Sequence, residues 1–216
     1  MKKPGLATHP SKRASRTRQQ ILQAAAEVFT AQGYSGATTR GIAETAGVSE
    51  LTLFRHFGTK KNLFLETIRQ NSALPSIEMA LAGQMSGDPR QDLTLIGVQL
   101  LKTLIQRREV ILMTFYEAER LPELRQIIVQ VQKAQRRLLA GYLFHLAKQG
   151  LIKTTDIEIS AQAFLGMLFA YAVYQALEKE TSNQNESEIR SIVEVFVDIF
   201  LEGILVQDEQ PDGGQS

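Results

Sequence analysis

The residues between positions 38 and 60 combine polar and basic side chains suited to a polyanion with small and apolar residues at regular spacing. Ile42 and Ala43 place an apolar residue directly before a small one. Gly47 follows Ala43 by four positions, and Leu53 follows it by ten. Two helices that cross closely need a small residue at the crossing, a residue that tolerates positive φ in the turn, and apolar residues that hold both against a core. This spacing predicts a helix-turn-helix.

The other chemistry-bearing residues do not form a catalytic or metal-binding pattern. The chain has no cysteine, which excludes disulfides and thiolate metal sites and fits a reducing cytoplasm. Its three histidines, His9, His56 and His145, belong to separate predicted elements. The sequence also lacks a G-x-S-x-G elbow, a P-loop and a G-x-G-x-x-G run. We therefore expect a protein that is not an enzyme and that needs neither a metal nor a cofactor.

Charge is distributed unevenly along the 216 residues, although the net charge is only +1. Residues 1–70 contain 11 Lys and Arg against 4 Asp and Glu, whereas the remainder contains 13 against 19. A basic segment joined to a larger acidic one suggests a polyanion partner for the first. A chance imbalance would look the same, so charge alone leaves both interpretations open.

Helical periodicity dominates the chain, and no strand pattern occurs. Gly33 is expected to end the first helix. Thr38 or Thr39, and then Ser49, can cap the two helices of the motif, and a fourth helix begins near Lys60. Further helices are predicted at 91–107, 109–118, 121–149, 157–180 and 187–206. We therefore expect an all-α fold.

Breaks in this pattern divide the chain into parts. The prediction is a basic flexible arm at 1–14, a helix-turn-helix domain at 15–60 with a connecting helix at 60–72, a larger helical domain at 73–207, and a disordered tail at 208–216. The longest apolar stretch, residues 163–177, is too short to span a bilayer, and the N-terminus lacks the apolar segment of a secretory signal. We therefore expect a cytoplasmic protein without a membrane partner.

The run TTRGIAETAGVSELTLFRHFGTKKNLF resembles the DNA-binding domain of the TetR family of bacterial transcriptional regulators. The resemblance covers about residues 15–70, while the helical remainder is compatible in length but carries no family motif. It implies a homodimer that binds double-stranded DNA through an N-terminal three-helix domain. It also implies that the larger helical domain binds an effector and makes the dimer.

The resemblance implies roles for individual residues of this segment. Thr39 would meet a phosphate at the start of the second helix, and Arg40 would reach a base edge, with a forked contact to guanine. Lys60 would contact phosphate at the start of the fourth helix. The recognition helix would present Ser49, Glu50, Leu51, Thr52, Phe54, Arg55 and His56 to the major groove. The basic residues Lys12, Arg13, Arg16 and Arg18 would follow the phosphates or the minor groove.

Two residues depart from the family pattern. Phe54 stands where tyrosine is common, and without the hydroxyl that touches a phosphate it can only pack. Glu50 puts a negative charge at the groove face, where it could accept from a cytosine amino group or be repelled by phosphates. Simpler roles stay open at other positions: Thr39 as a helix cap, Arg55 as a solvated charge and His56 as a packing residue.

The last two predicted helices form the dimer surface in TetR-like proteins. The interface is predicted at Phe164, Leu168, Ile192, Phe196 and Phe200. An internal core is the alternative, but both faces of these helices look apolar, which favours an additional interface.

The resemblance also implies an effector pocket, placed at Met113, Phe115, Tyr116, Phe144, Met167, Tyr171 and Tyr174. Such residues at helical spacing equally suit a plain core. Glu117, His145 and Gln175 could orient a ligand if they point inward.

Together these expectations describe a sequence-specific transcriptional regulator, a repressor that a small-molecule effector releases from a palindromic operator. Two helix-turn-helix copies related by a twofold axis match a palindrome. A protein-interaction adaptor that binds DNA weakly is one alternative, and an enzyme with a DNA-binding-like domain is another. Alanine at Arg40 and Lys60 would separate them, because an adaptor would keep its activity.

Overall fold

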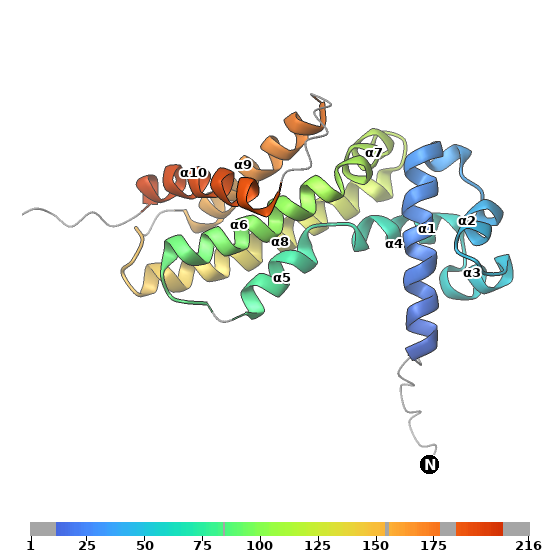
Figure 1. Cartoon of the computed structure of the whole chain (residues 1–216), viewed down its shortest axis with the longest axis horizontal. Helices are drawn as coiled ribbons and strands as arrows, with labels where there is room; N and C mark the ends of the chain where they lie inside the picture. Colours follow the sequence, from blue (N-terminus) through green and yellow to red (C-terminus); the bar gives the residue numbers. More distant parts are fainter. Residues whose placement is uncertain (1–11, 84, 154–155, 178–184, 205–216) are drawn as a thin grey trace, which may run out of the picture. The chain divides into compact units, whose positions relative to one another are not determined.

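The structure is a computed structural model, and it describes residues 12–83, 85–153, 156–177 and 185–204. Every regular element in those ranges is a helix, which confirms the predicted all-α fold (Figure 1). The helices are α1 Lys12–Gly36, α2 Thr39–Thr45, α3 Glu50–Phe57, α4 Lys60–Gln70, α5 Leu74–Ala82, α6 Pro89–Gln106, α7 Arg108–Ala118, α8 Pro122–Lys148, α9 Ile157–Leu177 and α10 Glu186–Ile204. Most of the predicted arm and the whole predicted tail lie outside the described residues.

The chain forms two compact units. Unit 1 contains Met1–Asn71 together with Glu109–Ile127, and unit 2 contains Ser72–Arg108 together with Ile128–Ser216. Most of α7 and the start of α8 therefore belong with the helix-turn-helix, although the sequence pattern assigns them to the larger helical domain. The predicted limits of the helix-turn-helix domain at 15–60 and of the larger helical domain at 73–207 stay a prediction.

In unit 1, α1 packs against α2 and α4, and α3 packs against both of those shorter helices (Figure 1). The buried side of α1 is the stripe that the periodicity predicts: Ile21, Leu22, Ala25, Val28 and Phe29. The shorter helices contribute Ile42, Ala43, Leu53, Phe57, Leu63, Phe64 and Ile68. Gly47, in the turn between α2 and α3, has φ 66°, a conformation that side chains with a Cβ rarely adopt. The spacing argument for a helix-turn-helix is thus realised in the fold.

Helix α1 differs from its prediction at both ends. It begins at Lys12, so residues 12–14 are helical rather than part of an arm. At the other end Gly33 has φ 68° and kinks the helix, and helical structure resumes and continues to Gly36. Glycine tolerates this backbone, so the predicted break is present, but it is a bend within the element.

In unit 2, α6 lies at the centre, with α5, α9 and α10 packed against it. Helix α5 is absent from the predicted elements, and it carries a proline, Pro75, in its first turn. Proline at the first or second position of a helix suits its start, where the missing N–H would have no partner inside the helix. Gly97 lies where α6 approaches α10, and a Cβ there would be 2.6 Å from Val193 Cγ1.

Asp92 is a buried carboxylate on α6 that accepts hydrogen bonds from neutral groups. Ser86 donates its N–H at 2.7 Å and its hydroxyl at 2.8 Å, Gly87 donates its N–H at 3.0 Å, and the Tyr142 hydroxyl donates at 2.9 Å. Burial alone raises the pKa of Asp92, but these hydrogen bonds outweigh it and hold that pKa below its ordinary value. Burial and the Asp92 charge raise the pKa of Tyr142. Asp92 thus ties the loop before α6 to α8.

Candidate nucleic-acid interface

Three short helices of unit 1 begin at a hydroxyl that accepts a backbone N–H. Thr38 Oγ1 accepts from Gly41 N at 3.0 Å, Ser49 Oγ accepts from Thr52 N at 3.2 Å, and Thr59 Oγ1 accepts from Asn62 N at 3.0 Å. Such caps satisfy helix-end donors that otherwise lack a partner. The cap of α2 is therefore Thr38, and Thr39 is left for another role.

Thr39 and Glu50 join the starts of α2 and α3. The Thr39 hydroxyl donates to a Glu50 carboxylate oxygen at 2.6 Å. The sequence pattern does not predict this contact across the turn. In this arrangement a phosphate near Thr39 would meet the backbone amides at the start of α2 rather than a free hydroxyl. The negative charge of Glu50 is turned partly toward its neighbour helix.

The exposed face of α3 carries side chains that take no part in the contact between Thr39 and Glu50. Leu51 is 62% exposed and Phe54 is 41% exposed, and Arg55 also faces solvent. Arg40, at the start of α2, has an 81% exposed side chain and pairs with Glu44 at 3.0 Å. Exposed pairs of this kind are weak, contributing about 0.3–0.5 kcal/mol, so the guanidinium can exchange Glu44 for another anion at small cost.

Lys60 bridges the start of α4 to the loop between α1 and α2. Its Nζ donates to the Ala37 carbonyl at 2.7 Å and lies 4.7 Å from the centre of the Tyr34 ring. That ring packs in turn against Phe29 and Phe64. Lys60 therefore holds the loop that leads into α2, in addition to the phosphate contact predicted for it.

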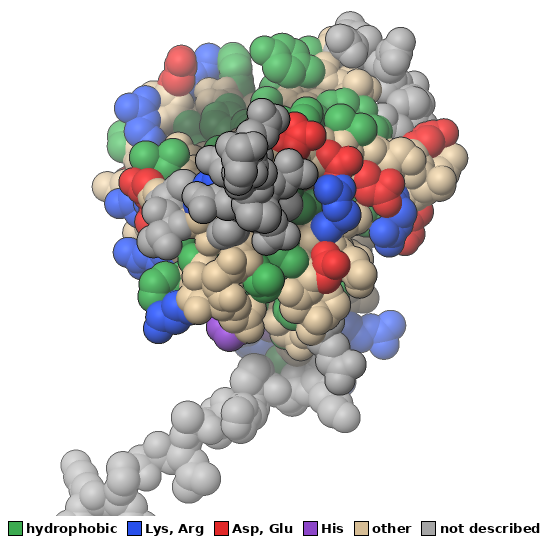
Figure 2. Space-filling view, turned by 90° about the vertical axis from the view of Figure 1, so that its left-hand side faces the viewer, with side chains coloured by type: hydrophobic (Ala, Val, Ile, Leu, Met, Phe, Trp, Pro, Cys, Tyr) green, Lys and Arg blue, Asp and Glu red, His purple; other side chains and the backbone are tan. Residues whose placement is uncertain are grey.

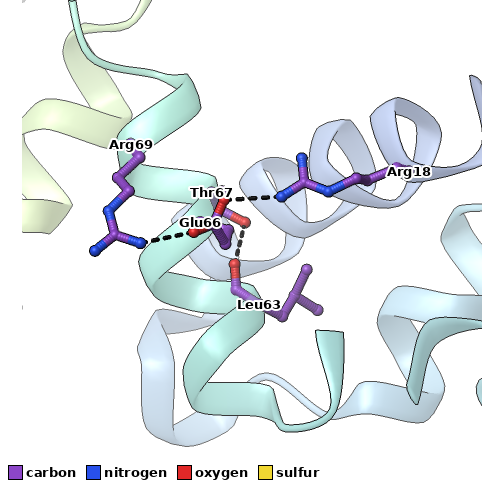
Figure 3. Close-up of polar contacts among 5 residues, drawn as sticks. All are labelled: Arg18, Leu63, Glu66, Thr67 and Arg69. Atoms are coloured by element: carbon purple, nitrogen blue, oxygen red, sulfur yellow. Dashed lines mark hydrogen bonds and ion pairs between the residues drawn. The ribbon is translucent and has the colours of Figure 1, made fainter. Parts of the chain in front are cut away.

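His56 is half-buried, with its ring 6.1 Å from that of Phe57, which agrees with the packing alternative. Near it, Arg18 donates to Glu66 at 2.8 Å, and Arg69 donates to the other oxygen of the same carboxylate at 2.6 Å (Figure 3). Burial alone raises the pKa of Glu66, but the two guanidinium groups outweigh it and lower that pKa. Arg18 thus ties α1 to α4, in addition to the contact with the phosphates or the minor groove predicted for it.

Glu117, on α7, contacts the kink of α1 instead of pointing toward a ligand. It is 3% exposed, and its Oε1 accepts the backbone N–H of Tyr34 at 3.1 Å. Close by, Lys61 of α4 pairs with Glu123 at the start of α8 at 2.6 Å. These contacts explain why the α7 segment belongs to unit 1. No sequence signal marks them, because the partners are 83 and 62 positions apart.

The residues predicted for an effector pocket are divided between the units. Met113, Phe115 and Tyr116 lie in unit 1, and Phe144, Met167, Tyr171 and Tyr174 lie in unit 2. Phe115, Tyr116, Phe144 and Tyr174 are exposed, whereas the other three are half-buried. His145 contacts Gln149 at 3.1 Å on the surface. The described residues do show a groove of about 300 Å³ between α8 and α9, lined by Val129, Gln132, Lys133, Gln135, Arg136, Gln162, Leu165, Gly166 and Phe169. None of these belongs to the predicted pocket.

The residues predicted for the dimer surface also divide into two sets. Phe164, Leu168 and Phe200 are buried within the chain, which agrees with the alternative that they belong to an internal core. Ile192 and Phe196 are half-buried. The exposed apolar residues of the same helices lie on their other sides: Ile159, Tyr174 and Leu177 on α9, and Val195 and Ile199 on α10.

The fold and the exposed recognition helix define a helix-turn-helix DNA-binding protein, and comparisons with known proteins agree. Residues 21–67 match the profile of "Bacterial regulatory proteins, tetR family", and residues 91–203 match that of "AefR-like transcriptional repressor, C-terminal domain". The HTH-type transcriptional regulator YvkB of Bacillus subtilis is 31% identical over 159 residues, which cover 74% of this chain and 82% of YvkB. The repressor AcnR of Corynebacterium glutamicum is 46% identical over 57 residues, 26% of this chain and 30% of AcnR.

Solved structures share the fold. A TetR-family regulator from Mesorhizobium loti superposes with a TM-score of 0.73 at 23% identity, covering 91% of this chain and 100% of that one. FadR from Bacillus subtilis, in complex with stearoyl-CoA, superposes with a TM-score of 0.70 at 18% identity, covering 86% and 98%. The chain belongs to the TetR family of bacterial regulators. It is a non-enzymatic transcriptional regulator that binds DNA.

Proposed function

We propose that this chain is a cytoplasmic repressor that binds a palindromic operator as a homodimer and leaves it when a small organic effector binds. The observation that carries the DNA contact is the exposed face of α3 together with the exposed Arg40 of α2, both in the basic part of the chain. The repressor mode is supported by the profile over residues 91–203, which describes repressors, and by the name of AcnR. Thr39, Ser49, Glu50 and Thr52 would position this face, and Arg55, His56 and Lys60 would meet the backbone.

The dimer is supported by an apolar helix that the chain leaves largely uncovered. The apolar stretch at 163–177, predicted to be too short to span a bilayer, lies within the longer helix α9, whose 21 residues are long and apolar enough to cross a membrane by length and composition alone. Only 22% of the most apolar window of α9 is buried. One side of α9 packs in unit 2 through Ala161, Phe164, Leu168 and Ala172. On the face drawn in Figure 2, hydrophobic side chains lie among charged and polar ones. The exposed apolar surface of α9 and α10 includes Ile159, Tyr174 and Val195. A second copy related by a twofold axis would cover this surface.

The groove between α8 and α9 lies beside the same surface. Gly166 lines it, and a Cβ added at Gly166 would meet nothing within 4 Å. Side chains of a second copy that covers this apolar face would also fill the groove, because protein interfaces pack about as densely as protein interiors.

A pair of glycine substitutions tests the dimer. Gly166 and Gly141 are both exposed helical residues whose added Cβ meets nothing within 4 Å. Gly166→Arg should convert the dimer to a monomer in size-exclusion chromatography with light scattering, while Gly141→Arg on α8 should leave it intact. A dimer that survives Gly166→Arg would place the interface elsewhere.

The effector contact is proposed for the four predicted residues that lie within unit 2, Phe144, Met167, Tyr171 and Tyr174. FadR with stearoyl-CoA supports a large organic ligand as the class of effector. A panel of acyl-CoA esters and aromatic acids, followed by thermal melting and by release of bound DNA, would find it. An effector must raise the melting temperature and lower the DNA affinity in the same concentration range, because both effects report one binding equilibrium.

Selection of bound fragments from a random DNA pool tests the operator. A palindrome with half-sites about one helical turn, roughly 34 Å, apart would support both DNA recognition and twofold symmetry. Recovery of fragments without a common sequence would exclude a sequence-specific repressor.

A further inference from the structure

The polar side chains at the start of α3 are already engaged with one another. The Ser49 and Thr52 hydroxyls lie 2.8 Å apart, and Ser49 also caps the helix. Glu50 accepts from Thr39 at 2.6 Å. Ser49, Glu50 and Thr52, which the resemblance places at the major-groove face, and Thr39, which it places at a phosphate, therefore hold the turn together. Readout by α3 must depend more heavily on its other exposed side chains.

Those exposed side chains are largely apolar. Leu51 is 62% exposed and Phe54 is 41% exposed. They are three positions apart, so they lie on one face of α3, and Arg55 follows on the same side. The buried residues of the helix, Leu53 and Phe57, point the other way into the core of unit 1. A leucine and a phenylalanine left in water on a short helix indicate a surface that becomes covered on binding.

In the major groove the apolar group that a side chain can meet is the C5-methyl of thymine. Neither Leu51 nor Phe54 can donate to a phosphate, and Phe54 lacks the hydroxyl that would let it do so. Arg55 follows Phe54 on α3 and is exposed, and Arg40 on α2 is exposed as well. The long-range attraction to DNA therefore comes from the guanidinium groups, and Leu51 and Phe54 contribute only short-range contacts.

We propose that Leu51 and Phe54 are specificity-determining residues that recognise thymine methyl groups in each operator half-site. The proposal rests on the proposed operator binding and adds the chemical class of base that α3 selects. Burying one methyl group against either side chain would strengthen binding about fourfold, given the free energy of burying one CH₂-sized group. Two such contacts per half-site, doubled by a second copy, would discriminate strongly between thymine and cytosine.

Replacing thymine by deoxyuridine in the selected operator removes the methyl group and leaves every hydrogen-bonding group of the base pair in place. Each thymine of the half-site is replaced in turn, and the affinity of the wild-type protein is measured at constant salt, since DNA affinity depends steeply on salt. We expect about a fourfold loss per half-site at one or two positions and no loss at the others.

Leu51→Ala and Phe54→Ala then assign the positions. Each variant should bind thymine and deoxyuridine operators equally at one of the sensitive positions, while keeping the preference at the other. Met79→Ala, at an apolar residue of α5 that is still more exposed than Leu51 and Phe54, is the control and should retain the full preference.

The outcomes separate this proposal from the operator itself. A wild-type protein that selects no common sequence contradicts the proposed function. A protein that selects an operator but binds its deoxyuridine form as tightly at every position contradicts thymine recognition alone. Because that arm uses the wild-type protein, the result does not depend on whether a variant folds.

Discussion

Gly97 is where a single added methyl group should cost the most, because α6 and α10 approach there without room for a side chain. A Cβ at this position would lie 2.6 Å from Val193 Cγ1, 3.5 Å from the Phe164 ring and 3.7 Å from Leu168 Cδ1. Carbon atoms in contact normally stay about 3.5–4.0 Å apart, so the first distance is short by roughly 1 Å. Val193 is β-branched, and it cannot swing away without leaving its preferred helical rotamer.

Two terms decide the size of the effect of Gly97→Ala. Overpacking of this kind costs about 1–3 kcal/mol, because side chains or whole helices must shift. Alanine in a helix interior is favoured over glycine by about 1 kcal/mol, which offsets part of the loss. We therefore expect the free energy of unfolding to fall by about 1–2 kcal/mol. Gly141→Ala, at a helical glycine with nothing within 4 Å, should instead raise it by about 0.5–1 kcal/mol.

Urea unfolding followed by circular dichroism measures both variants, at one fixed protein concentration because dimerisation contributes to apparent stability. The double variant Gly97→Ala with Val193→Ala provides the internal check. Removing Cγ1 should relieve the overlap, so the two changes should be less damaging together than their sum by about 0.5–3 kcal/mol. If Gly97→Ala is as stabilising as Gly141→Ala, or if the double variant is simply additive, the close approach does not constrain the fold.

Glu117→Ala should weaken DNA binding and speed amide exchange at Tyr34, because the buried acceptor that orients the end of α1 is lost. Glu117→Gln keeps an acceptor, so it should retain most of the DNA affinity and most of the protection of the Tyr34 amide. The control Glu119→Ala should retain them as well. Affinity that follows only the folded fraction would show a purely structural role. Asp92 has a lowered pKa in the folded protein, so its stabilisation is present above its unfolded pKa of about 4 and is lost as the pH falls through the folded value. Urea midpoints for Asp92→Asn should therefore change less than those of the wild type between pH 6 and pH 2, and equal slopes would refute this. Lys60→Met should lower the melting temperature as well as the DNA affinity, because its ammonium holds the Ala37 carbonyl; an unchanged melting temperature would leave only a phosphate contact.

Local chemistry was enough to predict much of unit 1. The positions of Ile42, Ala43, Gly47 and Leu53 specify two helices and the turn between them, because a helix crossing and a positive-φ turn accept few residue types. Ser49 was recognisable as a cap for the same reason, since a cap bonds to an amide three residues away.

The family assignment also came from this segment, while the larger helical part carried no motif and needed comparison with known proteins. The missed helix α5 shows the limit of local interpretation. Proline can end one helix or occupy the first turn of the next, and only the surrounding packing decides which of these roles Pro75 takes.

The tertiary structure decided which side chains are free to meet a partner. Thr39 and Glu50 are 11 positions apart, Lys60 and Ala37 are 23 apart, and Glu117 and Tyr34 are 83 apart, so no periodicity relates them. Each contact depends on the three-dimensional path of the backbone between its partners. The residue types of the DNA-binding segment could therefore be read along the chain, but the exposure of Leu51 and Phe54, and the internal use of their polar neighbours, became visible only after folding.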